Sequence, residues 1–162
     1  MRILIVSDTH RRNENYLRVL EDAGKIDMVI HCGDAEGSEF LLEKAADCPL
    51  HIVMGNNDFF SDLPTETELN IDGKKVLITH GHYYCVSNGY ELLKDEGKAR
   101  GFDVVMYGHT HRPVIDRSDD IAIINPGSLT YPRQEGRRPS YIIMETDRAG
   151  EMDFSLHYLE NG

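Results

Sequence analysis

The chain has 162 residues, enough for one domain with a substantial core, and 40% of them are apolar, as in an ordinary globular protein. Acidic residues outnumber basic ones by 28 to 17, and the net charge of −11 disfavours binding to nucleic acid, because phosphate backbones attract positive surfaces. No apolar stretch is long enough for a signal peptide or a membrane span, and three widely spaced cysteines argue against a disulfide framework and a thiolate zinc site, so we expect a single soluble, cytoplasmic domain over residues 1–162.

The first third of the chain alternates between short apolar runs and segments with helical spacing. Ile3 to Val6 is an unbroken apolar run rich in β-branched residues, which is typical of a strand buried on both faces. The pattern predicts strands at residues 3–6, 27–32 and 50–54, separated by helices at 11–24 and 36–47. This alternation indicates parallel strands joined by crossover helices.

The remaining two thirds of the chain are richer in hairpins. Asp72-Gly73 between two strand-like segments is a strong hairpin signal. The pattern predicts a helix at 88–100, a loop at 125–138, and strands at 65–71, 74–79, 103–107, 114–117, 121–125, 141–146 and 154–159. Together these elements predict two packed sheets with helices on their outer faces.

Polar residues follow the first strand directly, beginning with Asp8 and His10. They are two residues apart, so an extended backbone would point both side chains the same way. A carboxylate and an imidazole that converge make a pair of metal ligands, whereas Asp8 alone is equally typical of a helix N-cap. The pattern recurs at six strand ends, which carry Asp8 and His10, Asp34, residues 56–58, His80 and His82, His109 and His111, and residues 125–128.

The carboxyl ends of the strands in open α/β sheets form the ligand crevice. Two Asp, one Asn and four His residues at successive strand ends therefore indicate a binuclear metal site rather than a set of unrelated loop residues. Carboxylate, amide and imidazole ligands suit manganese, iron, zinc, nickel or cobalt, and we take two Mn²⁺ ions as the first expectation.

Five motifs, in order and spread over most of the chain, resemble the signature of the calcineurin-like metallophosphoesterases. They are Asp8-Thr9-His10, Gly33-Asp34, Gly55-Asn56-Asn57-Asp58, His80-Gly81-His82 and Gly108-His109-Thr110-His111. The small size, the His-Gly-His block and the Asn-Pro-Gly-Ser-Leu loop resemble the YfcE-type phosphodiesterase branch. The resemblance implies an α/β fold, a four-layer αββα sandwich of two mixed sheets, and a two-metal hydrolase.

The resemblance also implies which side chains hold the metal ions. One ion is held by Asp8, His10 and His111. The other is held by Asn56, His80 and His109, and Asp34 bridges the two. Two cations can clamp both oxygens of an in-line displacement, and water held between them becomes the hydroxide that attacks phosphorus.

One position departs from the signature, because Asn57 stands where the wider family has His. That His is thought to protonate the leaving oxygen, and an amide cannot act as a general acid. We therefore expect acid help to come from His82, from a metal-bound water or from nowhere, and we assign catalytic roles to Asp34, Asn56 and His82. Asn57, Arg11 and Arg133 are candidates for contact with an anionic substrate, although solvated surface positions are equally consistent with both arginines.

The expected function is a metal-dependent phosphodiesterase, a hydrolase that acts on small phosphodiesters. A phosphomonoesterase and a nuclease are the enzymatic alternatives, and the negative charge weighs against the nuclease. An alternative of another class is a protein-binding scaffold, since a retromer subunit of similar fold acts mainly by binding proteins. A scaffold has no need of seven metal ligands. The expected partner is a small phosphoester, with no membrane or nucleic acid, and the sequence leaves homo-oligomerisation open.

Overall fold

The computed structural model describes residues 1–160 of the chain, and its elements follow the expected order. The helices are α1 (Glu14–Ala23), α2 (Glu39–Ala46) and α3 (Glu91–Ala99), with the 3₁₀ turns η1 (His82–Tyr84) and η2 (Val86–Asn88) before α3. The strands are β1 (Arg2–Val6), β2 (Met28–His31), β3 (Leu50–Ile52), β4 (Glu66–Ile71), β5 (Lys74–Thr79), β6 (Val104–Met106), β7 (Pro113–Asp116), β8 (Ala122–Pro126), β9 (Ser140–Thr146) and β10 (Met152–Tyr158). Among residues 1–160, no helix has the length and apolar composition needed to span a membrane.

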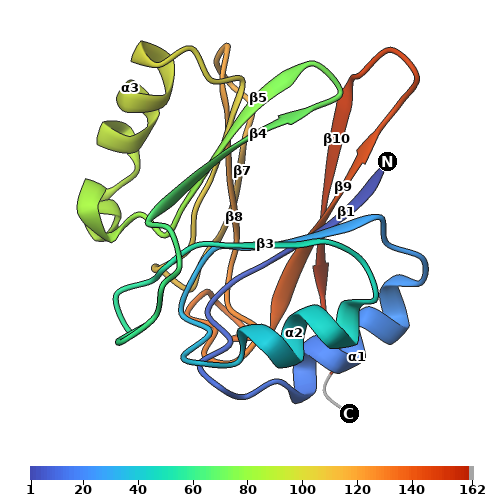
Figure 1. Cartoon of the computed structure of the whole chain (residues 1–162). Coiled ribbons are helices and arrows are strands. Elements are labelled where there is room, and N and C mark those ends of the chain that lie inside the picture. The colour runs from blue at the N-terminus through green and yellow to red at the C-terminus, as the bar shows by residue number, and fades with distance from the viewer. Residues whose placement is uncertain (161–162) are drawn as a thin grey trace.

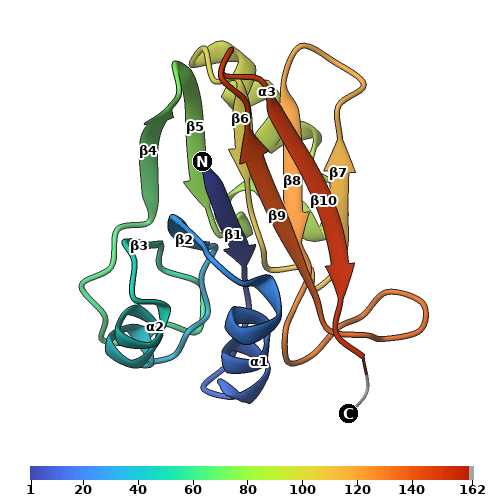
Figure 2. The ribbon, with the colours of Figure 1, turned by 90° about the vertical axis from the view of Figure 1, so that its right-hand side faces the viewer.

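Within the described residues the strands form two five-stranded mixed sheets. The first sheet has the order β10-β9-β1-β2-β3, and the second has the order β4-β5-β6-β8-β7. In the first sheet, β1 is central because it pairs in parallel with β2 and antiparallel with β9. In the second sheet, β5, β6 and β8 run parallel. Figure 2 shows β1 and β5 pointing toward the same end of the molecule.

Three apolar clusters hold the layers together. Ile3 and Ile5 of β1 face the second sheet and belong to the cluster between the two sheets. Leu4 and Val6 point the other way and pack beneath α1 and α2, while Leu77 belongs to the cluster beneath α3. Figure 1 shows α1 and α2 together, well apart from α3. The order of layers is therefore helix, sheet, sheet, helix, and the predicted αββα fold class is confirmed.

The differences from the expected boundaries are small and have local causes. Helix α1 begins at Glu14 rather than residue 11, because His10 and Arg11 have φ of 47° and 64°, in the left-handed region that a right-handed helix excludes. Strand β3 ends at Ile52, two residues before the expected end. Strand β10 begins at Met152, two residues before the expected start, because its ladder with β9 already includes that residue.

The Tyr16 hydroxyl connects the two helices that cover the first sheet. It is fully buried and donates a hydrogen bond to the Leu42 carbonyl oxygen at 2.9 Å. Tyr16→Phe removes this bond while keeping the ring, so we expect the free energy of unfolding to fall by about 1 kcal/mol. Urea unfolding checks the value. Tyr158→Phe is the control, because its hydroxyl has no hydrogen-bond partner within residues 1–160, and an equal loss in both variants would contradict the assignment.

Candidate metal centre

The seven residues predicted as metal ligands lie together at the carboxyl ends of β1, β2, β3, β5 and β6. The parallel strands of each sheet end on the same side, so the loops that follow them meet over one point. The ligand candidates are Asp8 and His10 after β1, Asp34 after β2, Asn56 after β3, His80 after β5, and His109 and His111 after β6.

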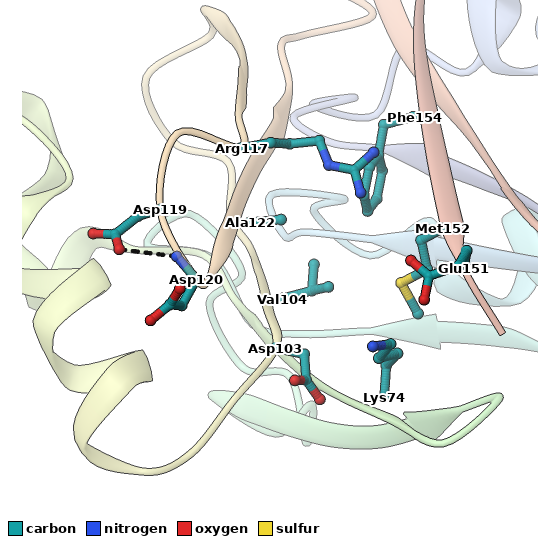
Figure 3. Close-up of a pocket in the computed structure, with 10 residues that line it drawn as sticks. All are labelled: Lys74, Asp103, Val104, Arg117, Asp119, Asp120, Ala122, Glu151, Met152 and Phe154. Carbon is teal, nitrogen blue, oxygen red and sulfur yellow. Dashed lines mark hydrogen bonds between the residues drawn. The ribbon is translucent and has the colours of Figure 1, made fainter.

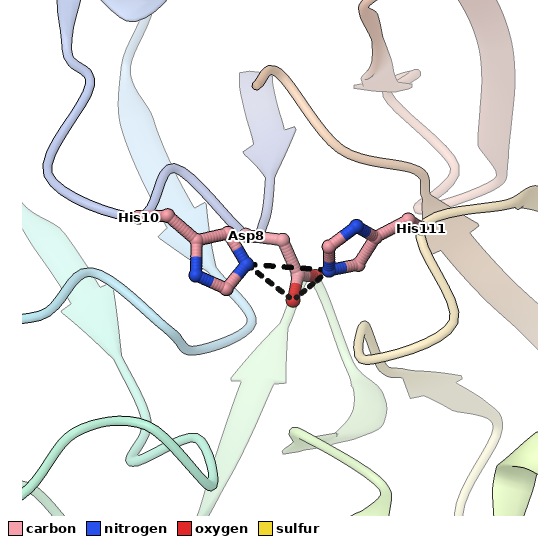
Figure 4. A group of neighbouring side chains, drawn as sticks. All are labelled: Asp8, His10 and His111. Carbon is pink, nitrogen blue, oxygen red and sulfur yellow. Dashed lines mark hydrogen bonds and ion pairs between the residues drawn. The ribbon is translucent and has the colours of Figure 1, made fainter. Parts of the chain in front are cut away.

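Asp8, His10 and His111 form the first group of converging atoms (Figure 4). The Nε2 atoms of the two histidines are 3.2 Å apart. The Asp8 Oδ1 atom lies 3.2 Å from Nε2 of His111 and 3.7 Å from Nε2 of His10. Three polar atoms from two distant parts of the chain thus point at one small space.

Asn56, His80 and His109 form the second group. The Asn56 Oδ1 atom lies 3.0 Å from Nε2 of His80 and 3.0 Å from Nδ1 of His109. The Asp34 Oδ2 atom lies between the groups, at 3.3 Å from Nε2 of His80 and 3.9 Å from Nε2 of His10. A carboxylate in this position is close to side chains of both groups, so it could be shared between two ions.

Backbone carbonyls determine which ring nitrogen of two histidines carries the proton. The Nδ1 atom of His80 lies 2.7 Å from the Cys32 carbonyl oxygen, and Nδ1 of His111 lies 2.7 Å from the Tyr131 carbonyl oxygen. A carbonyl oxygen only accepts, so both Nδ1 atoms must donate. When these rings are neutral, their Nε2 atoms therefore present lone pairs to the site, as metal-binding histidines do.

The converging atoms fit divalent cations. Donors that share one ion at a metal–ligand distance of ~2.1 Å lie roughly 3.0–3.4 Å apart in octahedral or tetrahedral geometry. The closest pairs here fall within that range. The Asp8 Oδ1 atom is buried and receives no hydrogen bond from any residue in the described part of the chain. The set of carboxylate, amide and imidazole atoms is one that first-row transition metals prefer.

Negative charge dominates the buried centre. Burial acts to raise the pKa of the Asp8 carboxyl, but His80, His10 and His111 outweigh it and lower that pKa well below its usual range. Burial likewise acts to lower the pKa of His80, but the carboxylates of Asp8 and Asp34 outweigh it and raise the pKa to about 9. The two carboxylates therefore attract positive charge strongly to this point.

The ligand candidates sit on an unusual backbone. Five of the seven have φ in the left-handed region, namely Asp8 (53°), His10 (47°), Asp34 (62°), His109 (69°) and His111 (57°). The expectation that an extended backbone aligns Asp8 with His10 is therefore wrong, although the two side chains do converge. Left-handed residues other than glycine are uncommon, cost about 1 kcal/mol or more each, and gather at functional sites.

The other predicted site residues have different positions. Asn57 donates from its backbone N–H and from Nδ2 to the Asp34 carboxylate, at 2.8 and 2.9 Å, so its side chain is bonded within the site. His82 is half-buried beside the second group, with its ring centroid 5.4 Å from that of His80. Arg11 donates to the Glu36 carbonyl oxygen at 2.9 Å. Arg133 is exposed, and its backbone N–H donates to the His111 carbonyl oxygen at 3.0 Å.

Two parts of the site were missed from the sequence. The Glu36 carboxylate lies 3.3 Å from Nδ1 of His10 and so holds that ring. Glu36 follows Asp34 at the same spacing that links Asp8 to His10, and this spacing was the available signal. The carbonyl groups of Cys32 and Tyr131 leave no signal, because backbone acceptors are common to every residue type.

The comparisons with known proteins agree with this geometry. Residues 1–149 match the calcineurin-like phosphoesterase superfamily domain. A phosphodiesterase of Methanocaldococcus jannaschii is 34% identical, over 78% of this chain and 83% of that protein. The structure of a Streptococcus pneumoniae protein described as a predicted phosphoesterase superposes with a TM-score of 0.79 at 28% identity, over 94% of this chain and 87% of that chain. A Vps29 mutant of Entamoeba histolytica gives 0.78 at 21% identity, over 99% and 100%, which shows the fold alone.

Asp58 is expected to position the ligand loops. Its buried carboxylate accepts three backbone hydrogen bonds, from Asp34 at 2.8 Å, Gly55 at 2.7 Å and Glu36 at 2.6 Å. Asp58→Ala frees these loops, so metal affinity should fall roughly 10–100-fold, as for other residues that support ligands. Titration calorimetry with Mn²⁺ gives the affinity. Asp62→Ala removes the same charge from the exposed surface nearby, and equal affinities in the two variants would refute the role.

Proposed function

Because the chain belongs to the calcineurin-like phosphoesterase superfamily, we propose that it is a phosphodiesterase that uses two divalent metal ions to hydrolyse small phosphodiesters. Asp8, His10 and His111 would hold one ion, and Asn56, His80 and His109 the other, with Asp34 shared between them. The observation that carries this proposal is the pair of Nε2 atoms, 3.2 Å apart, that face Asp8 Oδ1. At least one of these rings presents a lone pair there, so a cation stabilises the arrangement.

When bound, the two ions supply positive charge that polarises the phosphoryl group and stabilises the transition state. The residues of the chain prepare the site for that role. Asn57 donates two hydrogen bonds to the Asp34 carboxylate and fixes its orientation. His109 donates its backbone N–H to Asp8 Oδ2 at 3.1 Å, and the Ser7 hydroxyl donates to the same atom at 2.6 Å, so Oδ1 stays free to bind a cation.

We propose Mn²⁺ as the working metal, because oxygen and imidazole donors are mixed and no thiolate takes part. Cys32, Cys48 and Cys85 are free thiols, which supports a reducing compartment such as the cytoplasm. Residues of both sheets pack together in the apolar cluster between them, and the helices pack on the outer faces. Ligand candidates follow strands of both sheets, which supports action as one domain.

A protein-binding scaffold is the alternative, and its support is the likeness of the fold to Vps29. A binding surface gains nothing from strained backbone at ligand positions or from a buried, unbonded carboxylate oxygen. Both features favour the enzyme. The net charge of −11 also favours a small phosphodiester over a nucleic acid.

Removal of metal tests the proposed function directly. Dialysis against a chelator should lower hydrolysis of bis(p-nitrophenyl) phosphate by more than about 100-fold, because charge stabilisation of the phosphoryl group is lost. Addition of Mn²⁺ should restore it, with two ions per chain found by elemental analysis. Asp34→Ala, assayed with the same Mn²⁺, should not regain activity. Full activity in verified metal-free protein would refute the proposal.

The bonded Asn57 amide predicts a strong dependence on the leaving group. Asn57 cannot protonate a leaving oxygen, and its Nδ2 is already committed to Asp34. A positioned general acid contributes typically ~10²–10⁴-fold, so alkyl esters should be cleaved more slowly than nitrophenyl esters by about that factor. The slope of kcat/KM against leaving-group pKa measures this. A flat slope would show that another acid operates, and a steep slope in His82→Asn only would identify it as His82.

A further inference from the structure

Four exposed arginines surround the loop between β8 and β9. Arg112, Arg133 and Arg137 line one hollow, together with Thr130, Tyr131 and Pro132. The guanidinium group of Arg12 lies over the Tyr131 ring, 5.6 Å from its centroid. Within residues 1–160, none of these four guanidinium groups forms a hydrogen bond or an ion pair with another side chain. We call these four residues the arginine cluster.

Unpaired arginines are unexpected in a chain with 28 acidic and 17 basic residues. Three other arginines form ion pairs with carboxylates within residues 1–160, as Arg100 does with Glu66 and Arg138 with Glu160. A hollow at the opposite end of the sandwich shows the contrast (Figure 3), because its cationic side chains, Lys74 and Arg117, share it with four acidic ones, Asp103, Asp119, Asp120 and Glu151. Among residues 1–160, the hollow of the arginine cluster is thus lined by positive charge without an acidic side chain, unlike the hollow in Figure 3.

The arginine cluster adjoins the metal centre. The Tyr131 carbonyl accepts the hydrogen bond from His111, and the Tyr131 ring lies 5.4 Å from the His10 ring. Arg133 bonds the His111 carbonyl through its backbone N–H at 3.0 Å. A second hollow shares Arg112 and Arg133 with the first and is also lined by Thr110, which lies between His109 and His111. The two hollows have volumes of about 580 and 360 Å³, enough for a phosphate group.

We propose that the arginine cluster binds a second phosphate group of the substrate. The preferred substrates are then phosphodiesters that carry at least one further phosphate besides the one that is hydrolysed. This inference rests on the proposed function, because it takes the scissile phosphate to lie at the metal centre. Guanidinium groups match phosphate oxygens with paired N–H donors, which explains arginine rather than lysine at these positions. The acidic remainder of the surface repels a long polyanion, so a small substrate is favoured over a nucleic acid.

Two esters with one leaving group test the proposal. They are p-nitrophenyl thymidine 5′-phosphate with and without an added 3′-phosphate, assayed with Mn²⁺-loaded protein. Wild-type protein should prefer the ester with two phosphates by about tenfold in kcat/KM, the effect of one charge-assisted contact. Arg112→Ala combined with Arg133→Ala should bring this ratio close to one. Arg117→Ala combined with Arg148→Ala removes equal charge from the opposite end and should keep the ratio.

A binding measurement separates this inference from the proposed function. Titration calorimetry compares thymidine 3′,5′-bisphosphate with thymidine 5′-monophosphate on the same Mn²⁺-loaded proteins. If neither ester is hydrolysed but the bisphosphate binds about tenfold more tightly through Arg112 and Arg133, the proposed function fails and the phosphate site stands. No preference in wild type, an unchanged preference in the Arg112 and Arg133 variant, or an equal loss in the control would overturn the inference. Tighter binding of a single-stranded oligonucleotide than of the bisphosphate would also overturn it.

Discussion

The carboxylates of Asp8 and Asp34 are withdrawn from water next to one another, and the rest of the structure depends on how their charge is compensated. Removing a carboxylate from water costs several kcal/mol unless a positive partner is supplied. The surrounding histidines are poor partners when neutral, because the Cys32 and Tyr131 carbonyls direct the lone pairs of His80 and His111 toward the carboxylates. A metal cation would satisfy carboxylate and imidazole at once, which fits the convergence of carboxylate, amide and imidazole atoms at this end of the sandwich.

The scaffold around this point absorbs the strain that the arrangement requires. Left-handed φ angles at Asp8, His10 and Asp34 are tolerated because the strands before them are locked between two apolar clusters. Ser128 adds a further tie, since its hydroxyl donates to the Asp8 carbonyl oxygen at 2.8 Å and accepts from the Tyr131 backbone N–H at 2.8 Å. The same hydroxyl thus joins the loop of Asp8 and His10 to the loop that carries Arg133 and Arg137.

The fold and the convergence of the ligand candidates could be predicted from the sequence, because each depends on patterns that side chains display. Apolar runs such as Ile3 to Val6 predict buried strands, and parallel strands bring their carboxyl ends together. The left-handed φ angles of Asp8 and His10 could not be predicted, since neither residue type by itself indicates a positive φ. The carbonyl partners of His80 and His111 are equally invisible. Within residues 1–160, Arg112 forms no ion pair, and this too depends on three-dimensional spacing, which charge counts along the sequence do not contain.

The central position of β1 in the first sheet has a consequence for folding during synthesis on the ribosome. Strand β1 leads directly to the first two ligand candidates, yet its antiparallel neighbour β9 begins only at Ser140. At translation rates of ~5–20 residues per second, roughly 7–30 seconds separate the two strands. During that interval the apolar run from Ile3 to Val6 has an unpaired edge, a hazard for aggregation. The metal centre itself can be completed only after His111, the last ligand candidate in the chain, has been synthesised.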